Sequence, residues 1–133
     1  MLAKHEHDLL SGRGARLREV RRDLLRQNPG ATQRCFQRPV GTDLFLWYDD
    51  RRGLVQIQLT FERLVLEWAE DEGVHTGHLT SFDPLHPLTD QGKLVFDPAL
   101  DGGTQERARA VLEQATVDEL TLAMVRTKLG LKK

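Results

Sequence analysis

The sequence predicts an α+β fold, in which an N-terminal helix, a four- to five-stranded antiparallel meander, a long loop and two C-terminal helices follow one another. Segments in which apolar and polar residues alternate are concentrated between residues 32 and 79, and segments with apolar residues at helical spacing flank them on both sides. The chain has 133 residues, of which 39% are hydrophobic and 29% are charged. We therefore expect a single α+β domain over residues 14–133, with the two last helices packed on one face of the sheet.

The N-terminal residues predict a flexible arm followed by a helix. The run Ser11-Gly12-Arg13-Gly14 interrupts any helix that begins before it, so residues 1–13 are expected to form the arm. Asn28-Pro29-Gly30 ends the helix that follows, because asparagine tolerates the left-handed conformation and proline cannot continue a helix. From Ala15 onward, apolar residues recur at the spacing of one helix face, at Leu17, Val20, Leu24 and Leu25.

Five segments in the middle of the chain have the character of β-strands. Residues 32–38 are polar and suit a sheet edge, whereas both parities of residues 43–48 are apolar, which predicts a strand covered on both faces. Residues 54–61 alternate with their apolar side chains on odd numbers, but in residues 64–68 the apolar side chains fall on even numbers. A turn is therefore predicted at Phe61-Glu62-Arg63. Residues 74–79 complete the meander.

A long loop and two helices complete the predicted fold. Residues 80–103 are rich in proline and glycine, and a connection of this length is typical of a functional or disordered segment. Residues 104–114 have apolar side chains at helical spacing. The sequence Thr116-Val117-Asp118-Glu119 has the capping-box pattern of a new helix, which Gly130 ends.

Charge and cysteine content narrow the expected partners and compartment. Lys and Arg number 19 against 20 for Asp and Glu, so the net charge of −1 provides no long-range attraction to nucleic acid or to an anionic membrane. The longest apolar run, residues 44–48, is far shorter than the roughly 20 residues of a transmembrane helix. The first eight residues contain acidic side chains and no apolar core of a secretory signal, so no such signal is expected. The lone Cys35 forms no intramolecular disulfide and is expected to be an inert, semi-buried thiol. We therefore expect a cytoplasmic protein that binds no membrane.

Short catalytic and nucleotide-binding motifs do not occur, so the sequence favours a non-catalytic protein and predicts no cofactor. One alternative is a metal-dependent enzyme that uses loop carboxylates and histidines, because imidazole and carboxylate are ligands for divalent transition metals. Residues 75 and 78 point to opposite faces of a regular strand, so these two histidines converge only if Gly77 breaks the strand. Otherwise they are surface histidines without a special role. The candidate ligands are His75, His78, Asp83 and His86.

A second alternative is an anion-binding site on the first predicted helix. Arg18, Arg21 and Arg22 would there contact phosphate or RNA. The aromatic side chains expected of a protein that binds single-stranded nucleic acid are missing from this segment. We therefore expect these arginines to pair with acidic segments of the fold, and we expect no nucleic-acid partner.

Two aromatic residues provide a different signal. If helices cover the sheet through Leu44 and its neighbours, Phe45 and Trp47 project from the opposite face, beside Gln56 and Gln58. Aromatic side chains among polar ones are enriched at protein interfaces. The alternative is that a helix or the long loop covers them. No substrate, small-molecule ligand or definite function can be assigned to the protein from the sequence alone. The residues favour a small binding or interaction module that forms a homodimer through this sheet face.

Overall fold

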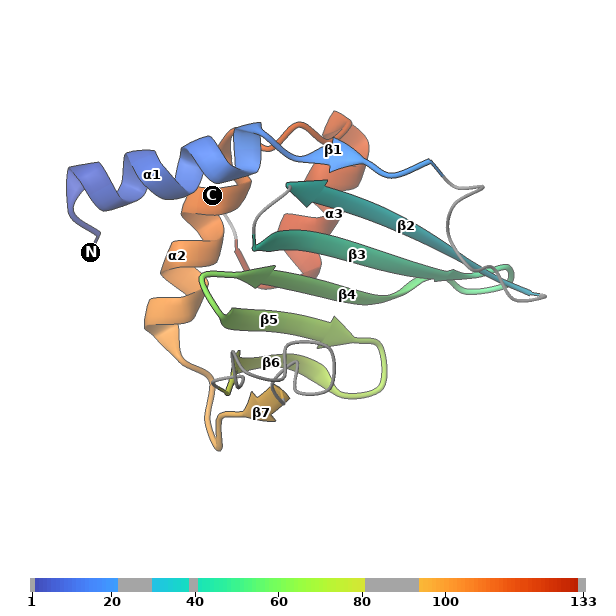
Figure 1. The fold of residues 1–133 in the computed structure, drawn as a ribbon. Helices are drawn as coiled ribbons and strands as arrows, with labels where there is room; N and C mark the ends of the chain where they lie inside the picture. Colours follow the sequence, from blue (N-terminus) through green and yellow to red (C-terminus); the bar gives the residue numbers. More distant parts are fainter. Residues whose placement is uncertain (1, 22–29, 39–40, 81–93, 132–133) are drawn as a thin grey trace, which may run out of the picture.

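The computed structural model describes residues 2–21, 30–38, 41–80 and 94–131. Within these residues the chain forms an α+β fold with one seven-stranded antiparallel sheet, whose strands lie side by side in sequence order (Figure 1). The helices are α1 (Lys4–Ala15), α2 (Gly102–Glu113) and α3 (Glu119–Lys128). The strands are β1 (Arg18–Glu19), β2 (Ala31–Arg38), β3 (Thr42–Asp49), β4 (Gly53–Phe61), β5 (Leu64–Ala69), β6 (Gly73–Leu79) and β7 (Leu94–Phe96).

The five central strands confirm the meander predicted from the sequence, but the sheet has two more strands than the four to five expected. At one edge, β1 pairs with β2 in a segment that was predicted to be helical. At the other edge, β7 pairs with β6 inside the predicted long loop. Both additions are only two or three residues long, and such short edge strands depend on pairing with a neighbour more than on their own sequence pattern.

The first helix lies about one helix length earlier than predicted. Residues 4–15, most of the segment expected to be a flexible arm, form α1 and pack against α2. The two glycines that were expected to interrupt this segment lie inside the helix. At Gly14 the backbones of α1 and α2 approach closely, because a Cβ there would overlap the Val111 carbonyl oxygen and lie 2.8 Å from the carbonyl carbon. The helix predicted from Ala15 is not present over residues 16–21, and the rest of its expected range lies outside the described residues.

The tight turn between β4 and β5 is where the sequence predicted it. Glu62 and Arg63 both adopt positive φ, at 48° and 64°, which is the backbone of a two-residue turn whose twist matches that of the flanking strands. This turn reverses the chain so that Leu64 pairs with Phe61. The change of apolar parity between β4 and β5 therefore keeps both sets of apolar side chains on the same face of the sheet.

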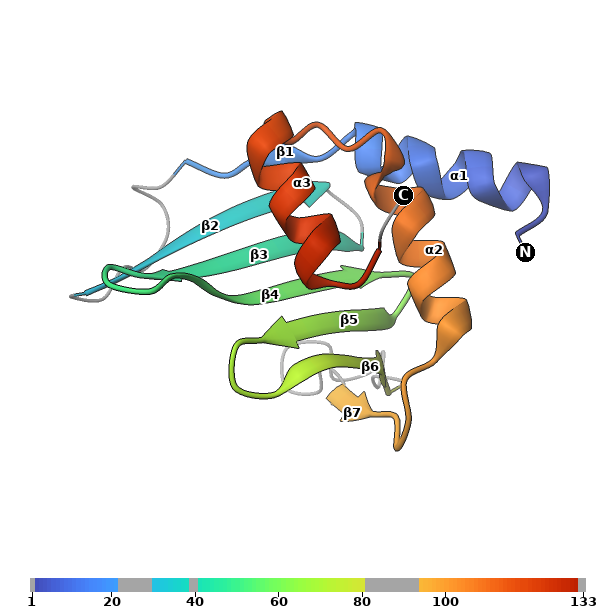
Figure 2. The same cartoon turned by 180° about the vertical axis from the view of Figure 1, so that it is seen from behind.

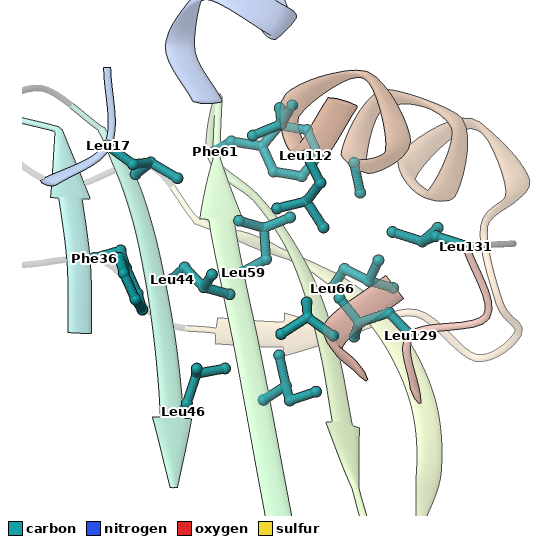
Figure 3. Close-up of a cluster of buried hydrophobic side chains, with 14 of the residues drawn as sticks. Leu17, Phe36, Leu44, Leu46, Leu59, Phe61, Leu66, Leu112, Leu129 and Leu131 are labelled. Carbon is teal, nitrogen blue, oxygen red and sulfur yellow. The ribbon is translucent and has the colours of Figure 1, made fainter. Parts of the chain in front are cut away.

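One face of the sheet is covered by helices and contains the hydrophobic core. Figure 2 shows α3 in front of β2, β3 and β4, with α1 and α2 crossing beside one end of the strands. Both C-terminal helices begin at an aspartate that caps a threonine three residues later: Asp101 accepts from the Thr104 amide and Asp118 from the Thr121 amide. The two helices contribute side chains to the core together with alternate residues of the strands (Figure 3), among them Leu44, Leu59, Phe61, Leu66, Leu112 and Leu129.

Candidate interaction surface on the sheet

The face of the sheet opposite the helices carries the aromatic pair predicted from the sequence. Leu44 and Leu46 of β3 are fully buried in the core, so the residues that alternate with them, Phe45 and Trp47, point to the other face. Their rings stack, with centroids 5.6 Å apart and planes 19° from parallel. In Figure 1, which views this face, no described helix or strand crosses in front of β3, β4 or β5.

Polar side chains continue this surface across the neighbouring strands. Gln58 pairs with Phe45 and Gln56 pairs with Trp47 in the register between β3 and β4. Gln58 Nε2 donates to Glu67 Oε1 at 3.0 Å, which links β4 to β5. Glu67 is in turn opposite His75 of β6. We call these six residues the aromatic–amide face, defined by Phe45, Trp47, Gln56, Gln58, Glu67 and His75.

Towards the β1 edge, the same side of the sheet bears two groups whose protonated form is favoured by burial. Cys35, opposite Phe45, is buried, and desolvation with the nearby Asp43 carboxylate raises the pKa of its thiol to about 11. Burial likewise raises the pKa of Asp43, although a hydrogen bond from Gln37 opposes the shift. A thiol with this pKa is almost entirely protonated at neutral pH and is therefore a poor nucleophile.

The structure does not bring together the histidines proposed as metal ligands. His75 pairs with Glu67 on the aromatic–amide face, whereas His78 pairs with Leu64 on the opposite face. Gly77 does not break β6 between them. It lies within the strand, and a Cβ there would lie 2.7 Å from the Val95 carbonyl oxygen, so this glycine permits the close approach of β7.

The other partners of these histidines lie within the fold. His78 Nδ1 lies 3.6 Å from Asp97 Oδ1, and His75 Nε2 lies 3.1 Å from the Glu72 carbonyl oxygen. Asp83 and His86 are outside the described residues. Over the described part of the chain, no three His, Cys, Asp or Glu side chains gather closely enough to hold a metal ion.

The arginines proposed as an anion site are not on a helix face. Arg18 lies in β1 and donates to the Leu17 carbonyl, Arg21 follows β1 on the surface, and Arg22 is outside the described residues. Arg18 lines a hollow of about 450 Å³ together with Arg38 and the acidic residues Glu19 and Asp43. The mixed charges of this hollow offset one another, so it has no strong preference for an anion.

Sequence reasoning missed Arg34, whose side chain connects three segments of the described structure. Its guanidinium binds both oxygens of Glu19, at 2.8 and 2.9 Å, and donates at 3.1 Å to Asp118 Oδ1 and to Thr121 Oγ1. It also lies 5.0 Å from the centre of the Phe36 ring. These contacts attach the start of α3 to β1 and β2. A lone arginine in a polar strand carries no sequence signal for such a role.

Hydrogen bonds at this junction, where the start of α3 meets β1 and β2, shift the pKa values of Asp118 and Arg34. The hydrogen bond from the Thr121 hydroxyl, together with bonds from Arg34 and the Thr121 amide, lowers the pKa of Asp118 to about 2, although desolvation opposes the shift. The two carboxylates raise the pKa of Arg34 further above its usual range. The junction therefore remains an ion pair throughout the physiological pH range, which suits a structural role.

Comparison with known proteins adds no assignment. No family model, curated protein or solved structure matches this chain. Among the described helices, none has the length and apolar character required to cross a bilayer. Any functional argument therefore depends on the geometry of the chain itself.

Proposed function

We propose that this protein is a small interaction module that forms a homodimer through the aromatic–amide face. The observation that carries the proposal is the stacked pair of Phe45 and Trp47, which lies on the sheet face opposite the helices and is flanked by two glutamines. Aromatic side chains are enriched in protein interfaces because they bury a large area at a small cost in side-chain entropy. Stacking also fixes the two rings before binding, which reduces that cost further.

The composition of the surface favours a second copy of the chain as the partner. In a two-fold symmetric dimer the same patch meets itself, so its groups have to be complementary to their own kind. Glutamine meets this requirement, because each amide provides both donors and acceptors, and two aromatic pairs can pack against each other. Glu67 is the one acidic residue of the patch and lies opposite His75, so the patch has no large excess of charge. The net charge of −1 adds little repulsion between copies.

The proposal assigns no reaction to this face. The rings of Phe45 and Trp47 and the amides of Gln56 and Gln58 neither titrate nor act as nucleophiles, and the neighbouring Cys35 thiol is buried and protonated. We further propose that the protein works in the cytoplasm, where a free thiol of this kind stays reduced.

The test is the oligomeric state of tag-free protein, measured by native mass spectrometry and by light scattering during size-exclusion chromatography. We expect a dimer at micromolar concentration for the wild type and a monomer for Trp47→Asp, because the substitution places a carboxylate in the centre of the contact. Leu120→Asp is the matched control. Leu120 is 80% exposed on α3, on the other side of the sheet, so this variant should remain dimeric.

A second variant separates a lost interface from a lost fold. Gln56→Lys changes a partly exposed side chain and leaves the core unaltered, yet it adds a positive charge from each copy to the proposed contact. It should dissociate the dimer while its circular dichroism and thermal midpoint stay at the wild-type values. A wild type that is monomeric at about 50 μM, or a dimer that survives both substitutions, contradicts the proposal.

A further inference from the structure

The two edges of the sheet differ in their chemistry. The β1 edge consists of Arg18 and Glu19, both exposed and charged. The β7 edge consists of Leu94, Val95 and Phe96, of which Val95 is 42% and Phe96 46% exposed. Natural proteins protect exposed edge strands from pairing with other chains by placing charges on them. The β1 edge has this protection, and the three residues of β7 lack it.

The hydrogen-bond pattern of β6 and β7 shows which backbone groups are turned outward. The Asp97 amide donates to the Thr76 carbonyl at 2.9 Å. Bonding pairs alternate along an antiparallel ladder, so Val95 bonds with its partner His78, and the backbone groups of Leu94 and Phe96 point away from β6. Within the described ranges no strand lies beyond β7, which forms the lower edge of the sheet in Figures 1 and 2.

We propose that β7 pairs with β7 of a second copy, in antiparallel orientation, with Val95 on the two-fold axis. In this register Leu94 of one copy lies opposite Phe96 of the other. These are the residues whose backbone groups point outward, so each pair exchanges two hydrogen bonds. The two sheets then join into one continuous sheet across the axis.

A second copy is the occupant because the strand is complementary to itself. Its three residues are apolar and uncharged, so pairing in this register places no like charges opposite each other. The Phe96 ring rests edge-on against His75, with centroids 5.9 Å apart, which orders the strand before it pairs. The β1 edge is not a suitable partner, because it has only two residues and both are charged.

This contact is separate from the aromatic–amide face and goes beyond the proposed function. Three residues per strand make a small interface, and small interfaces of this kind are weak. We therefore expect edge pairing at about 0.5 mM protein rather than at micromolar concentration. Where both contacts form, edge pairing would join face-to-face dimers into larger assemblies.

Charge substitutions at the proposed axis provide the test, carried out by sedimentation equilibrium in the Trp47→Asp background so that the face-to-face contact does not contribute. The Trp47→Asp protein should dimerise near 0.5 mM. Adding either Val95→Lys or Val95→Glu should leave it monomeric. In the proposed register, residue 95 of one copy lies opposite residue 95 of the other as a non-hydrogen-bonded pair, the cross-strand pair in which the side chains are closest, so two like charges would repel each other there. An equimolar mixture of the Lys and Glu variants should dimerise again. Val95→Thr, which retains strand propensity without charge, is the control and should dimerise like its parent.

The outcomes of this test are distinguishable from those of the proposed function. Edge pairing is refuted if the Trp47→Asp protein stays monomeric at about 1 mM, if the charged variants still dimerise, or if mixing them restores nothing. If Trp47→Asp perturbs the fold, the same series is measured in the Gln56→Lys background. A wild type that is monomeric at micromolar concentration but pairs through Val95 near millimolar concentration would overturn the face-to-face dimer and support edge pairing.

Discussion

Replacing Gly14 with alanine tests the packing of α1 on α2, because a single methyl group added there has no space. A Cβ at Gly14 would overlap the Val111 carbonyl oxygen and lie 2.8 Å from its carbon, whereas ordinary contact begins at 3.4 Å. The obstacle is backbone, so no side-chain rotation can relieve it. The overlap with the carbonyl oxygen requires the two helices to separate by more than about 1 Å, in an interior packed too closely to absorb the shift.

The expected effect is a loss of stability, although helix propensity alone predicts a gain. Alanine is favoured over glycine within a helix by about 1 kcal/mol, whereas overpacking costs about 1–3 kcal/mol. Separation of the helices also exposes part of Leu10 and weakens the bond from the Thr116 amide to the Gly14 carbonyl, which is 3.3 Å long. We expect Gly14→Ala to lower the free energy of unfolding by about 2 kcal/mol.

Urea denaturation monitored by circular dichroism measures this change, with Gly12→Ala as the control. Gly12 lies two residues earlier in the same helix, and a Cβ there would meet nothing within 4 Å. Its substitution should raise the free energy of unfolding by about 0.5–1 kcal/mol through helix propensity alone. If Gly14→Ala is as stable as the wild type or more stable, the close contact of α1 with α2 at this residue is refuted.

Two further predictions concern pH. Asp118, with a pKa of about 2 in the fold against an ordinary 3.8, contributes stability that is complete above about pH 4 and is lost as the pH falls towards 2. The wild type should therefore exceed Asp118→Asn by about 1 kcal/mol at pH 6, with a gap that closes by pH 2, and a gap independent of pH would contradict this. Hydrogen bonds to Glu113 and Asp8 raise the pKa of His7, so its contribution is complete below pH 6.5 and is lost at higher pH. The wild type should lose thermal stability from pH 6 to 8.5 relative to Glu113→Gln, and equal slopes would argue against this ion pair.

The sequence predicted those elements whose pattern reflects burial. Ile57, Leu59 and Phe61 alternate because one side of β4 faces the core, and the change of parity at Leu64 marks the turn that the structure contains. The alternation does not extend to the start of β4, where a bulge opposite Trp47 and Tyr48 places Leu54 in the core instead of Val55. The projection of Phe45 and Trp47 away from the helices followed from the same alternation. These features are local, and periodicity in the sequence records them directly.

Elements that depend on distant contacts were not predictable in the same way. The sequence Gly12-Arg13-Gly14 predicted an interrupted helix, because the close packing that requires Gly14 involves Val111 of α2, about a hundred residues later in the chain. The contacts of Arg34 likewise join three separate segments, and no local pattern indicates them. For the histidines, the parity of His75 and His78 correctly indicated opposite faces, and the structure shows that Gly77 does not alter this.

The long separation between α1 and its partner has a consequence for folding during synthesis. Each strand of the sheet pairs with a neighbour in sequence, so hairpins can form as the chain emerges. The helices that cover the sheet come last, and α1 is tied to α2 by bonds such as that from Arg107 to Glu6, which spans 101 residues. At ordinary rates of translation, the apolar face of β3 and β4 stays uncovered for roughly 5–10 s after those strands are made. The nascent chain therefore presents a transient binding site for chaperones, and that site disappears when α2 and α3 dock.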